Sequence, residues 1–330
     1  MTTCAPGALS QFLVKDGASA GSAPAYDWTS GTRYAYAYNR ETFGAPSQLL
    51  IGNGITGDRA SEPSLVREGN YQPGGTVEMD WSPGVGLSWL PRILGGTFSG
   101  NVITVANSLP SFGCLFKKST TKDYEYRDCM VDQWLLHGLS VPGDRPPMPL
   151  TCHLGIIGKA EKEPATESGY TPWTFPTDVT LGSSLAYSPL VMSDADPGNA
   201  APGEITLATL TCQIKEFWLL VNNFVHPRWV NSQTPTLLCP QRRVVMLRTR
   251  MAYDGTVADF NQAATGTNTG TLTFKNSTVS TSFSFVNLKR PRRTPFVLGK
   301  TEVDITTQWI AFQSADRATK EIVVTNDSTP

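Results

Sequence analysis

The stretch that decides the fold is Asn53–Phe98, NGITGDRASEPSLVREGNYQPGGTVEMDWSPGVGLSWLPRILGGTF. Its first part is a polar loop, and Gly74-Gly75 then opens a short run in which apolar and acidic residues alternate. Alternation of this kind predicts a half-buried strand. The apolar residues of the run are Val77, Met79 and Trp81, and the acidic ones are Glu78 and Asp80.

A short helix is predicted directly after this strand. Ser82-Pro83-Gly84 ends the strand, and apolar residues then recur at helical spacing as far as Gly95-Gly96. These apolar residues are Leu87, Trp89, Leu90, Ile93 and Leu94. The whole unit is therefore expected to be a loop, a strand, a short helix and a further strand.

Composition extends this interpretation to the whole chain. The 330 residues include 29 Gly and 24 Pro, and 40% are hydrophobic, which is enough to form a core. Many turns, abundant Thr, Ser and Val, and few helical patterns favour an all-β fold with one or two short helices. The net charge of -1 provides no general basic field for DNA binding. No apolar run approaches the roughly 20 residues of a membrane span, and no secretion signal is recognised.

Four regions are predicted from changes along the sequence. Residues 1–45 form an N-terminal arm, and residues 1 to about 25 of it are small, polar and expected to be flexible. Residues 46–163 form a first β domain, and residues 204–330 form a second one with a C-terminal tail. Residues 164–203 contain six prolines and little periodicity, so a linker or long loop is expected between the domains.

The two predicted β domains share a pattern. Each contains a strong strand with a tryptophan, VDQWLL or KEFWLL, and an alternating strand that leads into a short helix. In the second half this helix is predicted over residues 256–264. A duplication explains the likeness, and the alternative is that any two β halves share such patterns.

Common catalytic and metal-binding patterns are missing from the sequence. The three histidines, His137, His153 and His226, are not spaced as zinc ligands. The six cysteines are scattered and expected to be reduced and buried in a cytosolic chain. No nucleophile-elbow motif occurs, and the sequences GIIGKA and GKT lack the spacing of a phosphate-binding loop. No enzyme activity, metal or cofactor is therefore expected.

Two local features have alternative interpretations. Tyr34, Tyr36 and Tyr38 alternate with alanines at strand spacing. Stacked aromatics can hold single-stranded bases, but a strand that packs its tyrosines on a neighbour is the simpler interpretation. The basic run LKRPRR at residues 288–293 can contact phosphate, or it can form a solvated turn or an interface patch.

The order and spacing of several motifs resemble the tail tube proteins, or major tail proteins, of long-tailed bacteriophages. The motifs are Gly57-Asp58-Arg59, Arg67-Glu68-Gly69-Asn70, Gly74-Gly75-Thr76-Val77-Glu78 and LPRILGG at residues 90–96. The later stretches FKKST, YRDCMVDQWLLHGLSV, LGIIGKAE, RRVV and YDGTVADFNQ also resemble that family. The resemblance covers about residues 45–325.

The resemblance implies a β-sandwich or small barrel flanked by a helix. Its copies would join into rings, and the rings would stack into a hollow tube, which covers every strand edge with the next subunit. The implied partners are further copies of the chain, the tail tape-measure, terminator and distal tail proteins, and double-stranded DNA that passes without specific binding. The protein would be made in the host cytoplasm, belong to the virion and contact no membrane. Rings of three duplicated chains are favoured over rings of six chains, and a non-contractile tail over a contractile one.

Two sets of charged residues are candidates for contacts between subunits. The polar loop before Pro73 has no core pattern and is a candidate for stacking one ring on the next. Its charged residues are Asp58, Arg59, Glu62, Arg67 and Glu68. The polar strand faces are candidates for a subunit interface or the lumen, where the acidic face of one half would pair with the basic face of the other. This second set comprises Glu78, Asp80, Arg248, Arg250, Glu302 and Asp304.

The alternative function is a surface β-sandwich that binds carbohydrate or a receptor. In that case Trp28, Tyr34 and Tyr36 would line an exposed groove. Tube formation by the purified protein separates the two possibilities.

Overall fold

The computed structural model describes residues 11–17, 28, 33–51, 66–118, 123–140, 148–162, 189–192, 204–207, 210–252, 268–291 and 304–328. Strands dominate these residues, and the described part of the chain contains one α-helix, α1 (Pro83–Leu94). The fold is therefore all-β, as composition and periodicity predict. The predicted helix at residues 256–264 lies outside the described residues.

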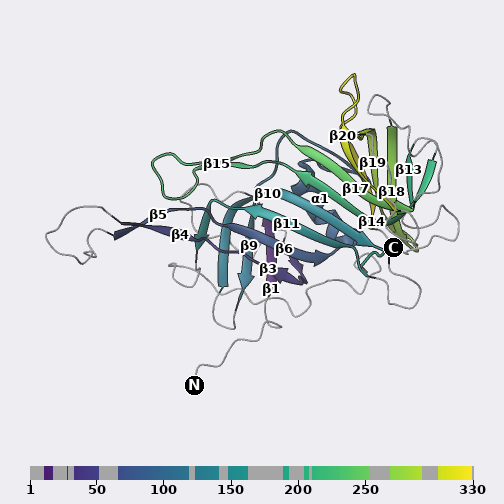
Figure 1. The fold of residues 1–330 in the computed structure, drawn as a ribbon. Coiled ribbons are helices and arrows are strands. Elements are labelled where there is room, and N and C mark those ends of the chain that lie inside the picture. Colours follow the sequence, from purple (N-terminus) through teal and green to yellow (C-terminus); the bar gives the residue numbers. More distant parts are fainter. Residues whose placement is uncertain are drawn as a thin grey trace.

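Strand β10 organises the first half of the chain (Figure 1). Its first part pairs with β9 and β12, and its later part pairs with β11. β6 lies between β11 and β3, and β1 lies between β9 and β2. The strands are β1 (Gln11–Asp16), β2 (Arg33–Tyr36), β3 (Arg40–Glu41), β4 (Ser47–Ile51), β5 (Val66–Tyr71), β6 (Gly74–Asp80), β7 (Phe98–Ser99), β8 (Val102–Thr104), β9 (Phe112–Lys117), β10 (Asp123–Leu139), β11 (Thr151–Ile157) and β12 (Ala160–Lys162).

Antiparallel pairings close a ring of strands in the second half. β14 pairs with β17, β17 with β20, β20 with β19, β19 with β18, β18 with β13, and β13 with β14 again. β21 pairs with residues 280–285 of β19, whereas β20 pairs with residues 287–289 at its end. The strands are β13 (Glu204–Leu207), β14 (Leu210–Asn222), β15 (His226–Arg228), β16 (Leu237–Cys239), β17 (Val244–Ala252), β18 (Asn268–Asn276), β19 (Val279–Lys289), β20 (Asp304–Phe312) and β21 (Ile322–Asp327).

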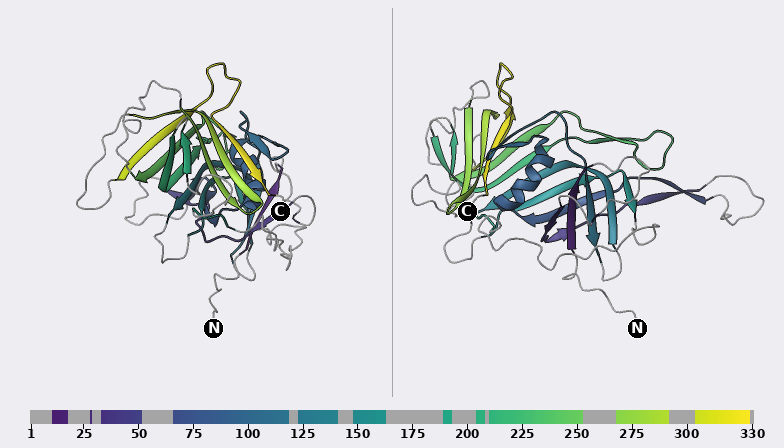
Figure 2. Two further views of the ribbon diagram at one scale, coloured as in Figure 1. Left: turned by 90° about the vertical axis from the view of Figure 1, so that its right-hand side faces the viewer. Right: turned by 180° about the vertical axis from the view of Figure 1, so that it is seen from behind.

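Two pairings join the halves. β10 pairs with β14 from Gln133–Asn222 to Leu139–Glu216, and β21 pairs with β8. Figure 2 shows α1 beside the strands of the first half, with the second half adjacent. One hydrophobic cluster contains side chains from both halves, including Trp89, Trp134, Phe283 and Trp309. Most of residues 164–203 lie outside the described residues, so the domain boundaries remain a prediction.

The strand and helix predicted from the opening stretch are confirmed. In β6 the apolar face is buried, with Val77 and Met79 at most 1% exposed. The Ser82 side chain accepts the amide of Val85 at 3.2 Å and so caps the N-terminus of α1. Gly95 ends the helix in the left-handed region at φ 79°, where glycine is favoured.

The N-terminal segment requires a correction. The expectation of a flexible arm over residues 1 to about 25 is wrong for Gln11–Asp16, which form β1 between β2 and β9. Phe12 and Val14 are at most 1% exposed. The apolar FLV sequence supplies this burial and outweighs the polar composition around it.

The N-terminal aromatics belong to the core. Tyr36 is buried, its hydroxyl hydrogen-bonds the Ser88 hydroxyl of α1, and its ring lies 5.5 Å from that of Trp89. Trp28 is 2% exposed. Trp28 and Tyr36 are therefore too buried to line the exposed groove of the alternative function, whereas Tyr34 is half-buried, and packing of the tyrosine strand on its neighbour is confirmed. Cys114, Cys129 and Cys152 are likewise buried and free, as predicted, whereas Cys239 is free but only half-buried.

Candidate assembly surfaces

One side of the sheet that runs from β6 through β11, β10 and β14 to β17 and β20 faces solvent. Strand alternation places Glu78, Asp80, Arg248, Arg250 and Asp304, the described members of the predicted interface or lumen set, on this side. The registers align His137 of β10, Trp218 of β14, Arg248 of β17 and Gln308 of β20 in one row across four strands. The His137 ring stacks on Trp218 at 5.3 Å, and the Arg248 guanidinium lies 4.7 Å from the same indole ring.

The next row along this face is a network of charges. Arg250 Nε lies 3.0 Å from Asp304 Oδ2, and Arg250 Nη1 lies 3.6 Å from Glu216 Oε2. Lys215 Nζ donates to Asp304 Oδ1 at 2.7 Å, and Glu216 Oε1 lies 3.0 Å from His137 Nε2. The hydrogen bonds from Lys215 and Arg250 hold the pKa of Asp304 below its ordinary value. Arg250 and Asp304 were both predicted as interface or lumen candidates, and in the structure they contact each other.

The acidic residues of β6 have their own partners within the chain. Asp80 accepts the side-chain amide of Asn39 at 2.9 Å, and Glu78 Oε2 lies 3.6 Å from His153 Nδ1. Strands β11, β10 and β14 separate them from the arginines of β17. Pairing between Glu78 or Asp80 and Arg250 of another subunit would therefore compete with contacts that each group already makes.

Two hairpins extend away from the sheets in the same direction, one formed by β4 and β5 and the other by β15 and β16 (Figure 1). We call them the two arms. The amide of Tyr71 donates to the carbonyl oxygen of Gln233 at 2.9 Å, and the Gln233 side chain donates to the carbonyl oxygen of Glu68 at 2.9 Å. These bonds tie the arms together. Large apolar side chains are exposed on them: Leu49 (67%), Trp229 (37%), Val230 (57%) and Leu237 (46%).

The candidate stacking residues lie on and beyond the first arm. Arg67 and Glu68 are exposed on β5. Asp58, Arg59 and Glu62 of the same set, and Glu302 of the other set, lie outside the described residues. The second arm was not predicted as a contact element. The adjacent large apolar residues Trp229 and Val230 were the sequence signal for it, and the structure shows that both are exposed.

A cleft of about 430 Å³ opens at the end of the second-half sheet. Arg243 crosses its wall, with Nε 2.8 Å from Glu321 Oε1 and Nη1 donating to the carbonyl oxygen of Ala106 at 3.0 Å. Arg242 and Lys320 also line the cleft and give it a positive character. Because Ala106 belongs to the first half, the hydrogen bond from Arg243 to its carbonyl oxygen also joins the two halves.

No sign of a metal centre or a membrane helix is found in the residues that the structure describes. Within them, no cluster of three or more His, Cys, Asp or Glu side chains could hold a metal ion. None of their helices is long and apolar enough to cross a membrane. The sequence matches no protein-family model, and it matches no curated protein at a significant level.

Proposed function

We propose that the protein is a structural component of a bacteriophage tail, whose copies form rings that stack into the tube through which DNA leaves the virion. The proposal starts from the sequence motifs that resemble tail tube proteins. It is supported by an all-β fold with exposed apolar arms and by one further observation, which is the repetition of the strand pairings in the two halves.

The same scheme of pairings occurs twice along the chain. In the first half β6 pairs with β11, β11 with β10, and β10 with β9 and β12. In the second half β17 pairs with β20, β20 with β19, and β19 with β18 and β21. The pairs β1–β2 and β1–β9 correspond to β13–β14 and β13–β18, and each half carries one arm before its β6 or β17.

The repetition extends to single residues. Phe12 faces Tyr36 on one side and Phe116 on the other, and in the second half Ile205 faces Cys212 and Leu272 in the same way. The register of β9 and β10 shifts between Tyr126 and Cys129, and that of β18 and β19 shifts between the corresponding residues Phe285 and Leu288. Independent β halves would not be expected to share a shift at one position. A duplicated unit explains both features.

Duplication gives a geometric basis for a ring. Within the chain, β10 of the first unit pairs with β14 of the second unit and continues the sheet. If the same joint is repeated between chains, the outer edge of β3 in one chain pairs with the strand of the next chain that corresponds to β10. Three chains then supply six similar units, which is the arrangement that the sequence favours.

The arms supply contacts in the other direction. Their exposed apolar side chains are surfaces that an isolated chain leaves in water, and burial of such side chains is a usual source of association energy. The arms of one ring would lie on the next ring. The near-neutral net charge of -1 is suited to a tube that DNA crosses without being held.

Electron microscopy of the purified full-length protein tests the proposal. We expect hollow tubes of stacked rings, and mass measurement on isolated rings should give three chains. A variant with residues 53–65 replaced by a short Gly-Ser linker should give rings that do not stack. A protein that stays monomeric at all concentrations and salt conditions, or that binds glycans as a monomer, would contradict the proposal and support the surface binding module.

A further inference from the structure

The outer side of β3 has backbone groups that a further strand could use. The amides of Thr42 and Gly44 each donate to a carbonyl oxygen of β6 at 3.0 Å. Successive backbone groups of a strand point to opposite sides, so the amide and carbonyl of Phe43 point away from β6. In the described part of the chain, no strand pairs with β3 on that side.

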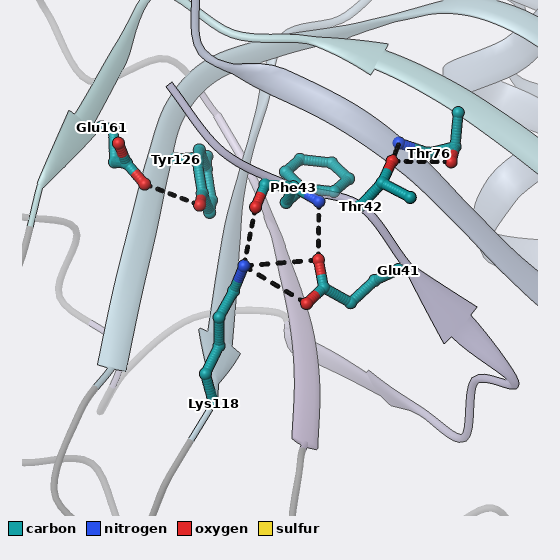
Figure 3. A network of polar contacts seen from close by, with 7 residues as sticks. All are labelled: Glu41, Thr42, Phe43, Thr76, Lys118, Tyr126 and Glu161. Atoms are coloured by element: carbon teal, nitrogen blue, oxygen red, sulfur yellow. Dashed lines mark hydrogen bonds and ion pairs between the residues drawn. The ribbon is translucent and has the colours of Figure 1, made fainter. Parts of the chain in front are cut away.

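Two side chains occupy these groups (Figure 3). The Phe43 amide donates to Glu41 Oε2 at 2.6 Å, and the Phe43 carbonyl oxygen accepts from Lys118 Nζ at 2.7 Å. Lys118 Nζ also lies 3.2 Å from Glu41 Oε1. We call Glu41 and Lys118 the edge clamp. Both side chains are mostly buried, with 18% and 29% of their surface exposed.

The second half has an aromatic pair at the positions of the edge clamp. Counting along the strands from the matched residues Tyr36 and Cys212, and Phe116 and Leu272, identifies the counterparts. They are Phe217 for Glu41, Leu219 for Phe43 and Phe274 for Lys118. Phe217 and Phe274 are fully buried, and their ring centroids are 5.1 Å apart.

The two sites differ in what covers their edge. In the second half β14 is already paired with β10, and Leu219 faces Leu136. The amide of Asn223 donates to the carbonyl oxygen of Asp132 in β10. Because backbone groups alternate along a strand, the amide of Leu219 points toward β10 as well. The charged pair therefore occurs where no described strand pairs with the edge, and the aromatic pair where β10 covers it. Charges directed inward on an edge strand are a known means of preventing unwanted strand addition.

We infer that the edge clamp keeps the open edge of the isolated chain from pairing, and that a strand of a second copy of this chain displaces it during assembly. The inference rests on the proposed function, because it takes the β10–β14 joint within the chain as the pattern for the joint between chains. Displacement exchanges the hydrogen bonds of Phe43 to two side chains for bonds to a backbone. The charged groups then turn toward solvent, which their partial exposure allows.

Transplanting the aromatic pair tests the clamp. The double variant Glu41→Phe/Lys118→Phe removes both side chains that bond to the Phe43 backbone, and separately Lys118→Met removes the one that bonds to its carbonyl oxygen. The control Lys159→Met removes a similar ion pair, 3.4 Å long, to Asp128. Sedimentation velocity over a concentration series gives the threshold of association, and hydrogen exchange of a peptide containing Phe43 reports the state of its amide.

We expect the thresholds of both clamp variants to fall roughly tenfold, because an added strand no longer has to break the clamp. The Phe43 amide should exchange faster in the monomeric double variant, which loses its acceptor Glu41, and the control should resemble wild type. Folded clamp variants with an unchanged or higher threshold would overturn the inference, and Lys118→Met serves if the double variant does not fold. Wild-type tubes with unchanged variant thresholds would reject the clamp alone. Earlier association of the variants without any rings or tubes would support the clamp and reject the proposed function.

Discussion

The side-chain amide of Asn326 donates to the carbonyl oxygen of Pro83 at 2.9 Å, across 243 positions of the chain. Pro83 opens α1 and Asn326 lies in β21, so this bond attaches the helix of the first half to the second half. The Oδ1 atom of Asn326 accepts from the hydroxyl of Thr281 at 2.7 Å, and the whole residue is 1% exposed. A Cβ on Gly86 would lie 2.8 Å from that oxygen, so the helix approaches the strand too closely for any larger residue without a shift.

Replacement of Asn326 should therefore destabilise the whole molecule. Asn326→Ala leaves the Thr281 hydroxyl and the Pro83 carbonyl without their buried partner, and we expect a loss of about 2–3 kcal/mol in the free energy of unfolding. Urea denaturation followed by tryptophan fluorescence measures it. Asn107→Ala, at an exposed asparagine, should change stability by less than about 0.5 kcal/mol. Equal stability of the two variants would contradict the role of Asn326.

The end of α1 gives a second prediction, with a control of the same type. Gly95 has a φ of 79°, and a Cβ there would lie 2.0 Å from the carbonyl oxygen of Ser108. Gly100 also has a positive φ, 60°, but nothing lies within 4 Å of its Cβ position. Gly100→Ala should cost about 1 kcal/mol from backbone conformation alone, and Gly95→Ala clearly more. Thermal unfolding of both variants decides this, and a smaller cost at Gly95 would be inconsistent with the structure.

Acid should weaken the charge network on the solvent-facing side of the sheet. The pKa of Asp304 is lowered from 3.8 by the hydrogen bonds from Lys215 and Arg250. A carboxyl with a lowered pKa in the folded state adds stability above its unfolded pKa and loses it as the pH falls through the folded pKa. Asp304→Asn should therefore be less stable than wild type at neutral pH, and the difference should shrink as the pH falls below the unfolded pKa of about 3.9 and through the lower folded pKa. Urea midpoints at several pH values test this, and a difference that does not depend on pH would exclude the ionic explanation.

The arms give a prediction about assembly rather than stability. Leu49 is 67% exposed on β4, so Leu49→Ser should leave the thermal unfolding of the monomer unchanged. If the arms join successive rings, the variant should form few or no tubes in electron micrographs. Leu87→Ser changes a leucine that is 45% exposed on α1 and serves as the control. Tubes of normal number and length from Leu49→Ser would remove this arm residue from the proposed contact.

Local structure could be predicted from the sequence because local rules determine it. The alternation in Gly74–Asp80 and the capping residues at both ends of α1 specify one strand and one helix. Polar composition failed for Gln11–Asp16, since a short apolar run is enough for a strand when two neighbouring strands cover it.

The candidate contacts depended on pairings between distant strands, which the sequence does not encode in any local pattern. Arg250 and Asp304 are on adjacent strands, so they pair with each other, whereas β6 lies several strands away. Glu41 and Lys118 gave no signal at all, because each is an ordinary charged residue until the register brings it to Phe43. The similarity of the two halves was visible in the sequence only as a weak pattern. The strand registers were needed to match individual residues between the halves.

The pairing of β21 with β8 has a consequence for synthesis on the ribosome. β8 lies near residue 100, yet its partner is residues 322–327, so a nascent chain has already exposed more than half its length before that partner is made. During this interval the helix lacks the amide of Asn326, and β8 is paired with β7 but not yet with β21. Completion of the fold therefore waits for β21, and an incomplete chain would be a poor building block for a ring.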